Sequence, residues 1–237
     1  MSRITLLSMA AVVVGVFVVL GLRELRMRML ETTLLREGRH REAARVSERL
    51  AAGLVARIAS SSRPVHQCNA AYALFLAGET REALARFDAI EAAAGTALPI
   101  AARYLCLRGR AMALVVLADD PARLRDTVVA LTEIRKTPLE GLLWAHAALQ
   151  NADPAAATTA LATLPPLPKA PPGRATEDAA AQRAAREKMF AALRGSALRG
   201  LGDLEAAAPL LARARAIPPA DAWSTLAEGP PATTPPA

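Results

Sequence analysis

Aromatic residues are nearly absent from this sequence. They make up 3% of its 237 residues, whereas hydrophobic residues together make up 53%. A β-sandwich is built largely from β-branched and aromatic side chains, so a chain with so few rings is a poor candidate for one. Alanine, leucine and valine suit the interfaces between packed helices. We therefore expect an all-α protein.

Cysteine and histidine are too scarce for the common structural or metal-binding frameworks. The two cysteines, Cys68 and Cys106, cannot form a disulfide framework or a four-cysteine zinc site. His66 with Cys68 is the one close pair of soft ligands, and no second pair lies nearby in the sequence. No glycine-rich phosphate loop, Ser-His-Asp order or paired-carboxylate motif stands out. We expect no metal, no cofactor and no catalytic residue, and we predict that the protein is not an enzyme.

Long runs of a single charge are also missing. The formal net charge of +7 permits attraction to nucleic acid or to anionic lipid. However, arginines alternate with acidic residues, as in Arg36-Glu37 and Arg41-Glu42, and no aromatic residues stand between basic ones to stack on bases. This pattern is typical of solvated helix surfaces, so binding of lipid or nucleic acid is the least favoured alternative.

One long uncharged run is present near the amino terminus. Residues 4–22, ITLLSMAAVVVGVFVVLGL, hold 19 residues without a charge. At about 1.5 Å per residue, a helix of this length spans about 28 Å, close to the hydrocarbon thickness of a bilayer. A cleaved signal peptide normally has a shorter apolar region that ends in small residues, whereas this run passes straight into Arg23. We predict a short tail, residues 1–3, followed by an uncleaved single-pass transmembrane anchor.

The charges that flank the anchor predict its orientation. Arg3 alone precedes it, while Arg23, Arg26 and Arg28 follow it directly. The flank richer in Lys and Arg normally stays in the cytoplasm. We expect a bacterial inner or plasma membrane protein with its soluble domain in the cytoplasm. The reverse orientation is the alternative, because nearby acidic residues dilute the basic patch.

Helix–turn–helix units follow the anchor. In the clearest one, Leu74 to Ile90, Gly78 forms the corner between two helices. Ala83, Phe87 and Ile90 fall at i, i+4 and i+7, so they share one face of the second helix. The small Ala83 allows the two helices to approach closely. This unit indicates an array of helical hairpins.

Glycine and Asp-Pro signals divide the rest of the chain into further helices. The expected corners are Gly38, Gly78, Asp119, Ala152 and Gly202. Helices are expected over residues 23–37, 40–60, 65–77, 80–94 and 100–117, from 121, 138 and 154 onward, and over 176–201 and 203–217. Thr80 is a candidate N-cap.

Proline marks where the helical pattern stops. Residues 165–174, PPLPKAPPGR, hold five prolines in ten residues, so we predict an extended linker over residues 165–175. Pro209 should kink the last return helix or delay its start. Residues 220–237 are polar and rich in proline, and we expect a mostly disordered tail with a short helical turn around Trp223.

The units resemble tetratricopeptide repeats. The best match is residues 188–219, with the family's characteristic positions in Gly195, Leu198, Gly202, Ala207, Leu211 and Pro219. Residues 64–95 match next best, through Ala71, Leu74, Gly78, Ala83 and Phe87, with Gly95 in place of the closing proline. The unit around Gly38 has Glu31 where a small residue belongs, and the two central units keep only the apolar spacing. The repeats would cover residues 23–164, with a last hairpin at 176–219.

The resemblance implies an α-solenoid, because one hairpin cannot bury its apolar face alone and neighbours must stack. The first helices of such an array line a groove that holds a peptide or helix of a partner. By the resemblance, the groove would be faced by Tyr72, Phe75, Leu76, Ser196 and Arg199, although packing between repeats is the alternative for the rings. We expect a membrane-anchored scaffold or adaptor for a protein partner. A structural subunit of a membrane complex is the alternative, and neither the partner nor the oligomeric state follows from the sequence.

Overall fold

The structure is a computed structural model that describes residues 3–58, 61–94, 97–165 and 177–229, with the backbone alone for residues 3–13, 177 and 178. Within these ranges every regular element is an α-helix, so the all-α prediction is confirmed. The helices are α1 (Arg3–Arg36), α2 (His40–Ala52), α3 (Leu54–Ile58), α4 (Ser62–Leu76), α5 (Thr80–Ala94), α6 (Ile100–Leu117), α7 (Pro121–Ile134), α8 (Pro138–Gln150), α9 (Pro154–Ala162), α10 (Glu177–Gly200), α11 (Leu204–Ala216) and α12 (Ala222–Glu228).

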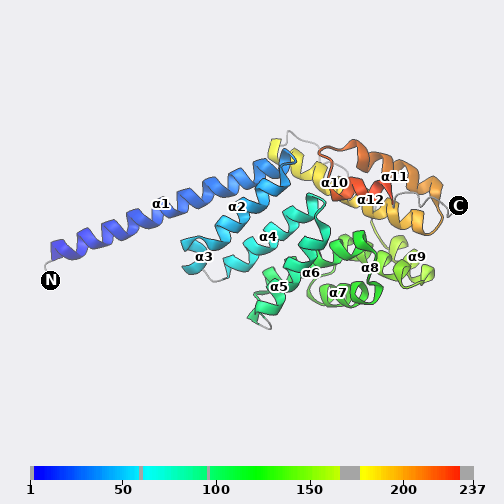
Figure 1. Cartoon of the computed structure of the whole chain (residues 1–237), viewed down its shortest axis with the longest axis horizontal. Helices are drawn as coiled ribbons and strands as arrows, with labels where there is room; N and C mark the ends of the chain where they lie inside the picture. Colours follow the sequence, from blue (N-terminus) through cyan, green and yellow to red (C-terminus); the bar gives the residue numbers. More distant parts are fainter. Residues whose placement is uncertain (1–2, 59–60, 95–96, 166–176, 230–237) are drawn as a thin grey trace.

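Helices that follow one another in the chain pack in pairs. The pairs are α1 with α2, α4 with α5, α6 with α7, α8 with α9, and α10 with α11. Neighbouring pairs then stack through contacts of α2 with α4, α5 with α6, α7 with α8, and α8 with α10 (Figure 1). This arrangement is consistent with an α-solenoid of helical hairpins.

The last part of the chain returns to the first. Helix α12 packs on α10 and α11 and also reaches α4, so the stack closes back on itself (Figure 1). The two ends of the stack meet at Gly38, where an added Cβ atom would lie 2.6 Å from Cβ of Pro219. The corner after α1 therefore lies directly against the connection from α11 to α12.

Each corner between paired helices contains a residue with a left-handed backbone. These residues, with their φ angles, are Gly38 (76°), Gly78 (83°), Ala118 (52°), Ala152 (60°) and Gly202 (82°). At four corners the next residue donates its N–H to the carbonyl five residues earlier, which is the Schellman closure of a helix end. The corner expected at Asp119 is at Ala118, because Asp119 lies beyond the helix end and Asp120 already caps the next helix.

Side-chain caps start most of the helices after a corner. Asp120, Asp153 and Asp203 each accept a hydrogen bond from the backbone N–H three residues further on, at 3.0, 2.9 and 3.1 Å. Thr137 and Glu140 form a capping box, in which the Glu140 carboxylate accepts from the Thr137 N–H at 2.7 Å. The helix starts predicted at the prolines after Asp120, Thr137 and Asp153 are confirmed.

Several boundaries differ from the prediction. The helix expected over residues 40–60 breaks at Gly53, whose extended backbone separates α2 from α3. Helix α4 begins at Ser62, three residues earlier than expected. Thr80 is the first residue of α5, with a buried side chain, and is not an N-cap preceding it. Helix α11 begins before Pro209 and continues through it on the exposed side of the helix, where water can take up the carbonyl that proline leaves without a donor.

The two proline-rich segments have different outcomes. The predicted linker lies almost wholly outside the described residues, which resume at residue 177. The predicted tail begins with an ordered helix, because residues 222–228 form α12 and Trp223 is only 2% exposed. The short helical turn expected around Trp223 is therefore confirmed, and residues 230–237 of the predicted tail lie outside the described residues.

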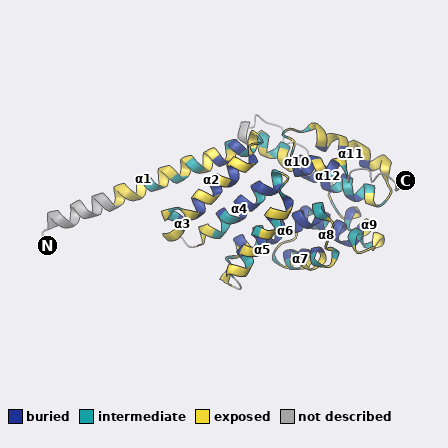
Figure 2. Cartoon of the chain, in the orientation of Figure 1, coloured by how far each residue is buried: buried dark blue, intermediate teal, exposed yellow. Residues whose placement is uncertain are grey.

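Helix α1 extends beyond the stack (Figure 1). Figure 2 shows that much of the described part of α1 outside the stack is exposed. Its apolar side chains before Arg23 include Val14, Phe17 and Val19, and all three are more than half exposed. Across the described part of the chain, no helix is long and apolar enough to cross a membrane. The predicted anchor, residues 4–22, falls partly on side chains outside that description.

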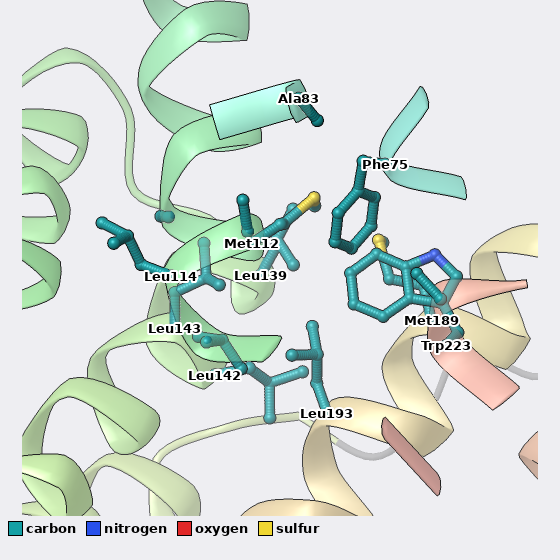
Figure 3. Packing of buried hydrophobic residues seen from close by; sticks show 14 of the residues in the cluster. Phe75, Ala83, Met112, Leu114, Leu139, Leu142, Leu143, Met189, Leu193 and Trp223 are labelled. Carbon is teal, nitrogen blue, oxygen red and sulfur yellow. The ribbon is translucent and has the colours of Figure 1, made fainter. Parts of the chain in front are cut away.

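One continuous hydrophobic core joins the helices, from Leu34 on α1 to Ala227 on α12. Figure 3 shows its centre, where Trp223 lies close to Phe75 and Met189. The core therefore ties α12 to two helices, α4 and α10, that are far apart in the sequence.

Candidate partner-binding groove

A cavity of about 850 Å³ opens between the first helices of the pairs and the returning carboxyl-terminal segment. Helices α1, α4, α6, α8 and α10 contribute to its walls, as does the connection from α11 to α12. We call this cavity the central groove and define it by Thr32, Leu35, Arg36, His40, Tyr72, Leu76, Tyr104, Arg108, Arg135, Thr137, Leu139, Ala181, Gln182, Ala184, Ala185, Arg186, Lys188, Met189, Phe190, Ile217, Pro218, Pro219, Asp221 and Trp223.

Three of the predicted groove residues lie at or near this cavity. Tyr72 and Leu76 line it and are half-buried. Phe75 is fully buried behind them, with its ring centroid 5.0 Å from that of Trp223 in an edge-on contact and 5.9 Å from that of Tyr72. The surface of Phe75 is thus covered by the chain's own α12.

The other two predicted residues lie on α10, outside the set that lines the cavity. Ser196 is half-buried there. Arg199 donates hydrogen bonds to the carbonyl oxygens of Leu226 at 3.0 Å and Ala227 at 3.3 Å. Arg199 therefore binds the carboxyl-terminal end of α12, where free carbonyls favour a cation.

A buried ion pair fixes the connection from α11 to α12 against α10. The Lys188 side chain is 1% exposed, and its Nζ lies 2.9 Å from an Asp221 carboxylate oxygen and also donates to the Pro219 carbonyl. His40 lies beside this pair, and burial lowers its pKa, so its ring is neutral at pH 7. The charges of Lys188 and Asp221 are already engaged with each other.

Three arginines line the central groove and, unlike Lys188, are not paired with a carboxylate among the described residues. Arg108 is on α6, Arg135 follows α7, and Arg186 is on α10. The Arg135 guanidinium lies 5.9 Å from the centroid of the Tyr104 ring, and that of Arg186 lies 5.5 Å from the centroid of Phe190. Among the residues that the structure describes, none of the three arginines has a carboxylate partner.

Arginines on the outer surface behave differently. Arg86 pairs with Glu48 on a neighbouring hairpin, and Arg213 pairs with Glu187 across the α10–α11 pair. These contacts join helices that are already packed together. Within the described residues Arg108, Arg135 and Arg186 have no such carboxylate partner, and Arg135 and Arg186 lie over aromatic rings instead.

The Glu140 carboxylate lies behind the groove wall and accepts hydrogen bonds from its neighbours. Glu140 is 1% exposed, and it accepts a hydrogen bond from the Tyr104 hydroxyl at 2.8 Å and from the Thr137 backbone. Burial raises the pKa of Tyr104, so this hydroxyl stays protonated and donates. Glu140 therefore positions the ring beneath Arg135 and does not open onto the cavity.

His66 and Cys68, the close pair of soft ligands in the sequence, contact different helices. The Nε2 atom of buried His66 lies 3.7 Å from Glu24 on α1, while the Cys68 thiol donates to the Ala102 carbonyl on α6 at 3.7 Å. The Cys106 thiol donates to the Phe87 carbonyl at 3.1 Å, and hydrogen bonding with Cys106 raises the pKa of Cys68. Over the described residues, no group of His, Cys, Asp and Glu side chains is arranged to hold a metal ion.

Comparison with known proteins found no relative of this chain. No protein-family model, curated protein or solved structure matches the chain. The resemblance of residues 64–95 and 188–219 to tetratricopeptide repeats remains a prediction from the sequence.

The sequence did not indicate the groove arginines, nor that the short helix around Trp223 packs against α4 and α10. Arg108, Arg135 and Arg186 are separated in the chain, and no local pattern distinguishes them from surface arginines. A signal for α12 was present in Asp221-Ala-Trp-Ser224, where Asp221 accepts hydrogen bonds from the N–H groups of Trp223 and Ser224. That capping box marks a helix start within an otherwise proline-rich tail.

Proposed function

We propose that this protein is a non-enzymatic, membrane-anchored helical-repeat scaffold that holds a segment of a protein partner in the central groove. The observation that carries the proposal is the groove itself, about 850 Å³ of space bounded by the first helix of each hairpin pair. Its walls combine apolar side chains, rings and cations, which is the mixture that orients a bound peptide. Resemblance to the tetratricopeptide family supports the same use of the first helices.

The titratable groups of the groove favour binding over catalysis. Lys188 and Asp221 neutralise each other, and the buried His40 is neutral. Arg108, Arg135 and Arg186 offer guanidinium N–H donors to the groove, and these donors suit the binding of a segment.

Membrane anchoring is proposed from residues 4–22. Nineteen uncharged residues match the thickness of a bilayer, and the described side chains of this run are largely exposed on α1. Apolar surface in water is unfavourable by about 25 cal/mol per Å², so a helix that is apolar on every side requires a cover. The arginines after Leu22 favour a cytoplasmic location for the helical stack.

A photo-crosslinking experiment tests the proposed groove. A benzoylphenylalanine in place of Gln182 faces the central groove, whereas one in place of Glu133 lies on the exposed surface of α7. In intact cells, the probe at residue 182 should give an adduct with a defined segment of one protein, and the probe at residue 133 should not.

A second substitution shows whether that adduct forms in the groove. Ala185 is exposed and lines the groove, so Ala185→Trp should fill the space and abolish the adduct. Ala208 is exposed on α11 away from the groove, and Ala208→Trp should leave the adduct unchanged. Equal adducts from residues 182 and 133, or persistence of the adduct in Ala185→Trp, would contradict the proposal.

A structural subunit of a membrane complex is the second candidate. Exposed apolar side chains on the outer surface favour it, namely Leu54 and Ile58 on α3 and Ile100 at the start of α6. In that case crosslinks from these positions should be stronger than those from residue 182, and they should survive the Ala185→Trp substitution.

A further inference from the structure

We infer that the segment bound in the central groove is acidic, with carboxylates that pair with Arg108, Arg135 and Arg186. This inference rests on the proposed function and specifies the chemistry of the partner. The three arginines come from three separate elements, so together they surround the cavity and do not form a patch on one helix.

The arginines are prepared to bind carboxylates. Arg135 lies over Tyr104 and Arg186 over Phe190, and such cation–π contacts limit the orientations of the guanidinium group. A guanidinium group offers two parallel N–H donors, which match the two oxygens of a carboxylate. A side chain already held in place loses less conformational freedom when it binds.

The charge of the groove is strongly one-sided. Of the described residues that line it, Asp221 is the one acid, and Lys188 neutralises it. Arg108 is half-buried at the groove, and Arg135 and Arg186 are exposed at it, so these three cations are accessible to a segment that enters. A neutral or basic segment would leave these cations without partners.

The chain's own segment shows which chemistry this surface accepts. On the α10 side of the groove, Asp221 is held by Lys188, and Trp223 packs edge-on against Phe75 two residues later. One carboxylate and one large apolar side chain thus occupy part of the groove. The uncovered part offers the same combination, with the three arginines beside Leu76 and Leu139. An acidic segment with interspersed apolar residues fits it.

A lipid headgroup and a nucleic acid fit less well. The groove begins on α1 at Thr32, ten residues after the end of the predicted anchor, which places it about 15 Å from the hydrocarbon edge along a straight helix. The rings of Tyr104 and Phe190 carry guanidinium groups on their faces, so they are not open platforms for stacked bases. A protein segment needs neither a position at the bilayer surface nor an open ring face to enter the groove.

Fluorescence anisotropy of the full chain in nanodiscs of uncharged lipid tests the inference. The probe is a fluorescein-labelled peptide of repeating Glu-Glu-Leu-Ala units, and its neutral twin carries Gln in place of every Glu. We expect the acidic peptide to bind at least about tenfold more tightly than its twin, and Arg108→Gln or Arg186→Gln to weaken it by about tenfold each. Arg103→Gln is the matched control, because Arg103 is exposed on α6 outside the groove and should change binding little.

The outcomes separate the inference from the function on which it rests. If both peptides bind equally and Ala185→Trp blocks both, the acidic preference is wrong and the groove still binds a segment. If neither peptide binds, both the inference and the peptide-binding function are overturned. A loss in Arg103→Gln equal to that in Arg108→Gln would reduce the effect to general surface charge. Complete competition by anionic vesicles or by single-stranded DNA would overturn the inference in favour of that ligand.

Discussion

Two alanines occupy backbone positions that favour glycine. Ala118 and Ala152 have φ angles of 52° and 60°, where a Cβ atom crowds the following carbonyl oxygen. At three equivalent corners the chain uses glycine. The substitutions Ala118→Gly and Ala152→Gly should each therefore stabilise the fold by about 0.5–1 kcal/mol, read as a rise in thermal midpoint of about 1–4 °C.

Gly78→Ala tests the opposite change, in which alanine replaces a glycine with a left-handed backbone. An added Cβ at Gly78 would meet no atom within 4 Å, so only the backbone conformation changes the energy. This substitution should lower stability by about 1 kcal/mol. Ala77 has an ordinary right-handed backbone, and Ala77→Gly should also destabilise the protein. A stabilising effect at Ala77 equal to that at Ala118 would show that strain is not the cause.

His146 makes the fold sensitive to acid. Its Nε2 lies 2.9 Å from the Leu193 carbonyl, and burial lowers its pKa from 6.5 to about 4. Between these values the unfolded chain binds a proton that the folded chain does not, so stability falls as the pH drops from about 6.5 to about 4 and then levels off. Burial also lowers the pKa values of His40 and His66, which act in the same direction.

A His146→Gln variant tests this linkage. Between pH 7.5 and pH 4.5 its loss of unfolding free energy should be smaller than that of the original chain by about 2 kcal/mol, because each pKa unit corresponds to about 1.36 kcal/mol. Chemical denaturation at several pH values measures the difference. Parallel stability curves for the two proteins over this interval would rule out His146 as the titrating group.

At the scale of the elements, Gly109 sets the distance between α5 and α6. An added Cβ at this position would lie 2.1 Å from Cζ of Phe87, a fully buried ring. We expect Gly109→Ala to destabilise the protein by about 1–3 kcal/mol through overpacking. The double substitution with Phe87→Leu should recover part of this loss, because leucine is shorter than phenylalanine. If the double variant is as unstable as the sum of the two single variants, the steric account fails.

Trp223 is the largest side chain that α12 buries in the fold. Trp223 is 2% exposed and packs against Phe75 on α4, so Trp223→Ala should cost about 3–5 kcal/mol. Limited proteolysis should then cut the segment after α11 before any other site. Trp144 is half-buried on α8, and Trp144→Ala serves as the control with a smaller expected effect. Unchanged protection of α12 in Trp223→Ala would show that other contacts hold it.

At the scale of the whole molecule, the proposed anchor should decide where the protein resides. Val14 and Val18 are 62% and 55% exposed on α1, so Val14→Lys with Val18→Lys should leave the helical stack intact. Each lysine near the centre of a bilayer costs about 3 kcal/mol, and we expect the variant to move from the membrane fraction to the carbonate-soluble fraction. Thr32→Lys, beyond the anchor, should remain in the membrane fraction. Retention of the double variant would refute residues 4–22 as the anchor.

The closed stack also limits what a partner can reach. Because α12 covers Phe75 and the Gly38 corner lies against Pro219, the groove is reached from the side where Gln182 and Ala185 are exposed. The resemblance to a repeat family gives no reason to expect this closure. It depends on the α11–α12 connection, which the buried Lys188–Asp221 pair holds in place.

Local chemistry was enough to predict most helices, because a cap or a corner depends on residues a few positions apart. The Asp-Pro starts, the glycine corners and the shared face of Ala83, Phe87 and Ile90 are of this kind, and all three residues of that face are buried. Gly53 and Pro209 show where local rules mislead. Helix α11 continues past Pro209 because it is packed against its neighbours. Gly53 ends α2, although the apolar pattern alone predicts that the helix continues.

Only the tertiary structure decided which distant surfaces meet. Trp223 reaches Phe75, and Arg108, Arg135 and Arg186 converge on one cavity, although nothing near them in the chain indicates these contacts. The physical reason is that such contacts depend on how the hairpins stack and on how α12 packs against α4. A sequence pattern records the apolar face of each helix. Shape complementarity among all the helices selects the surface that each face covers.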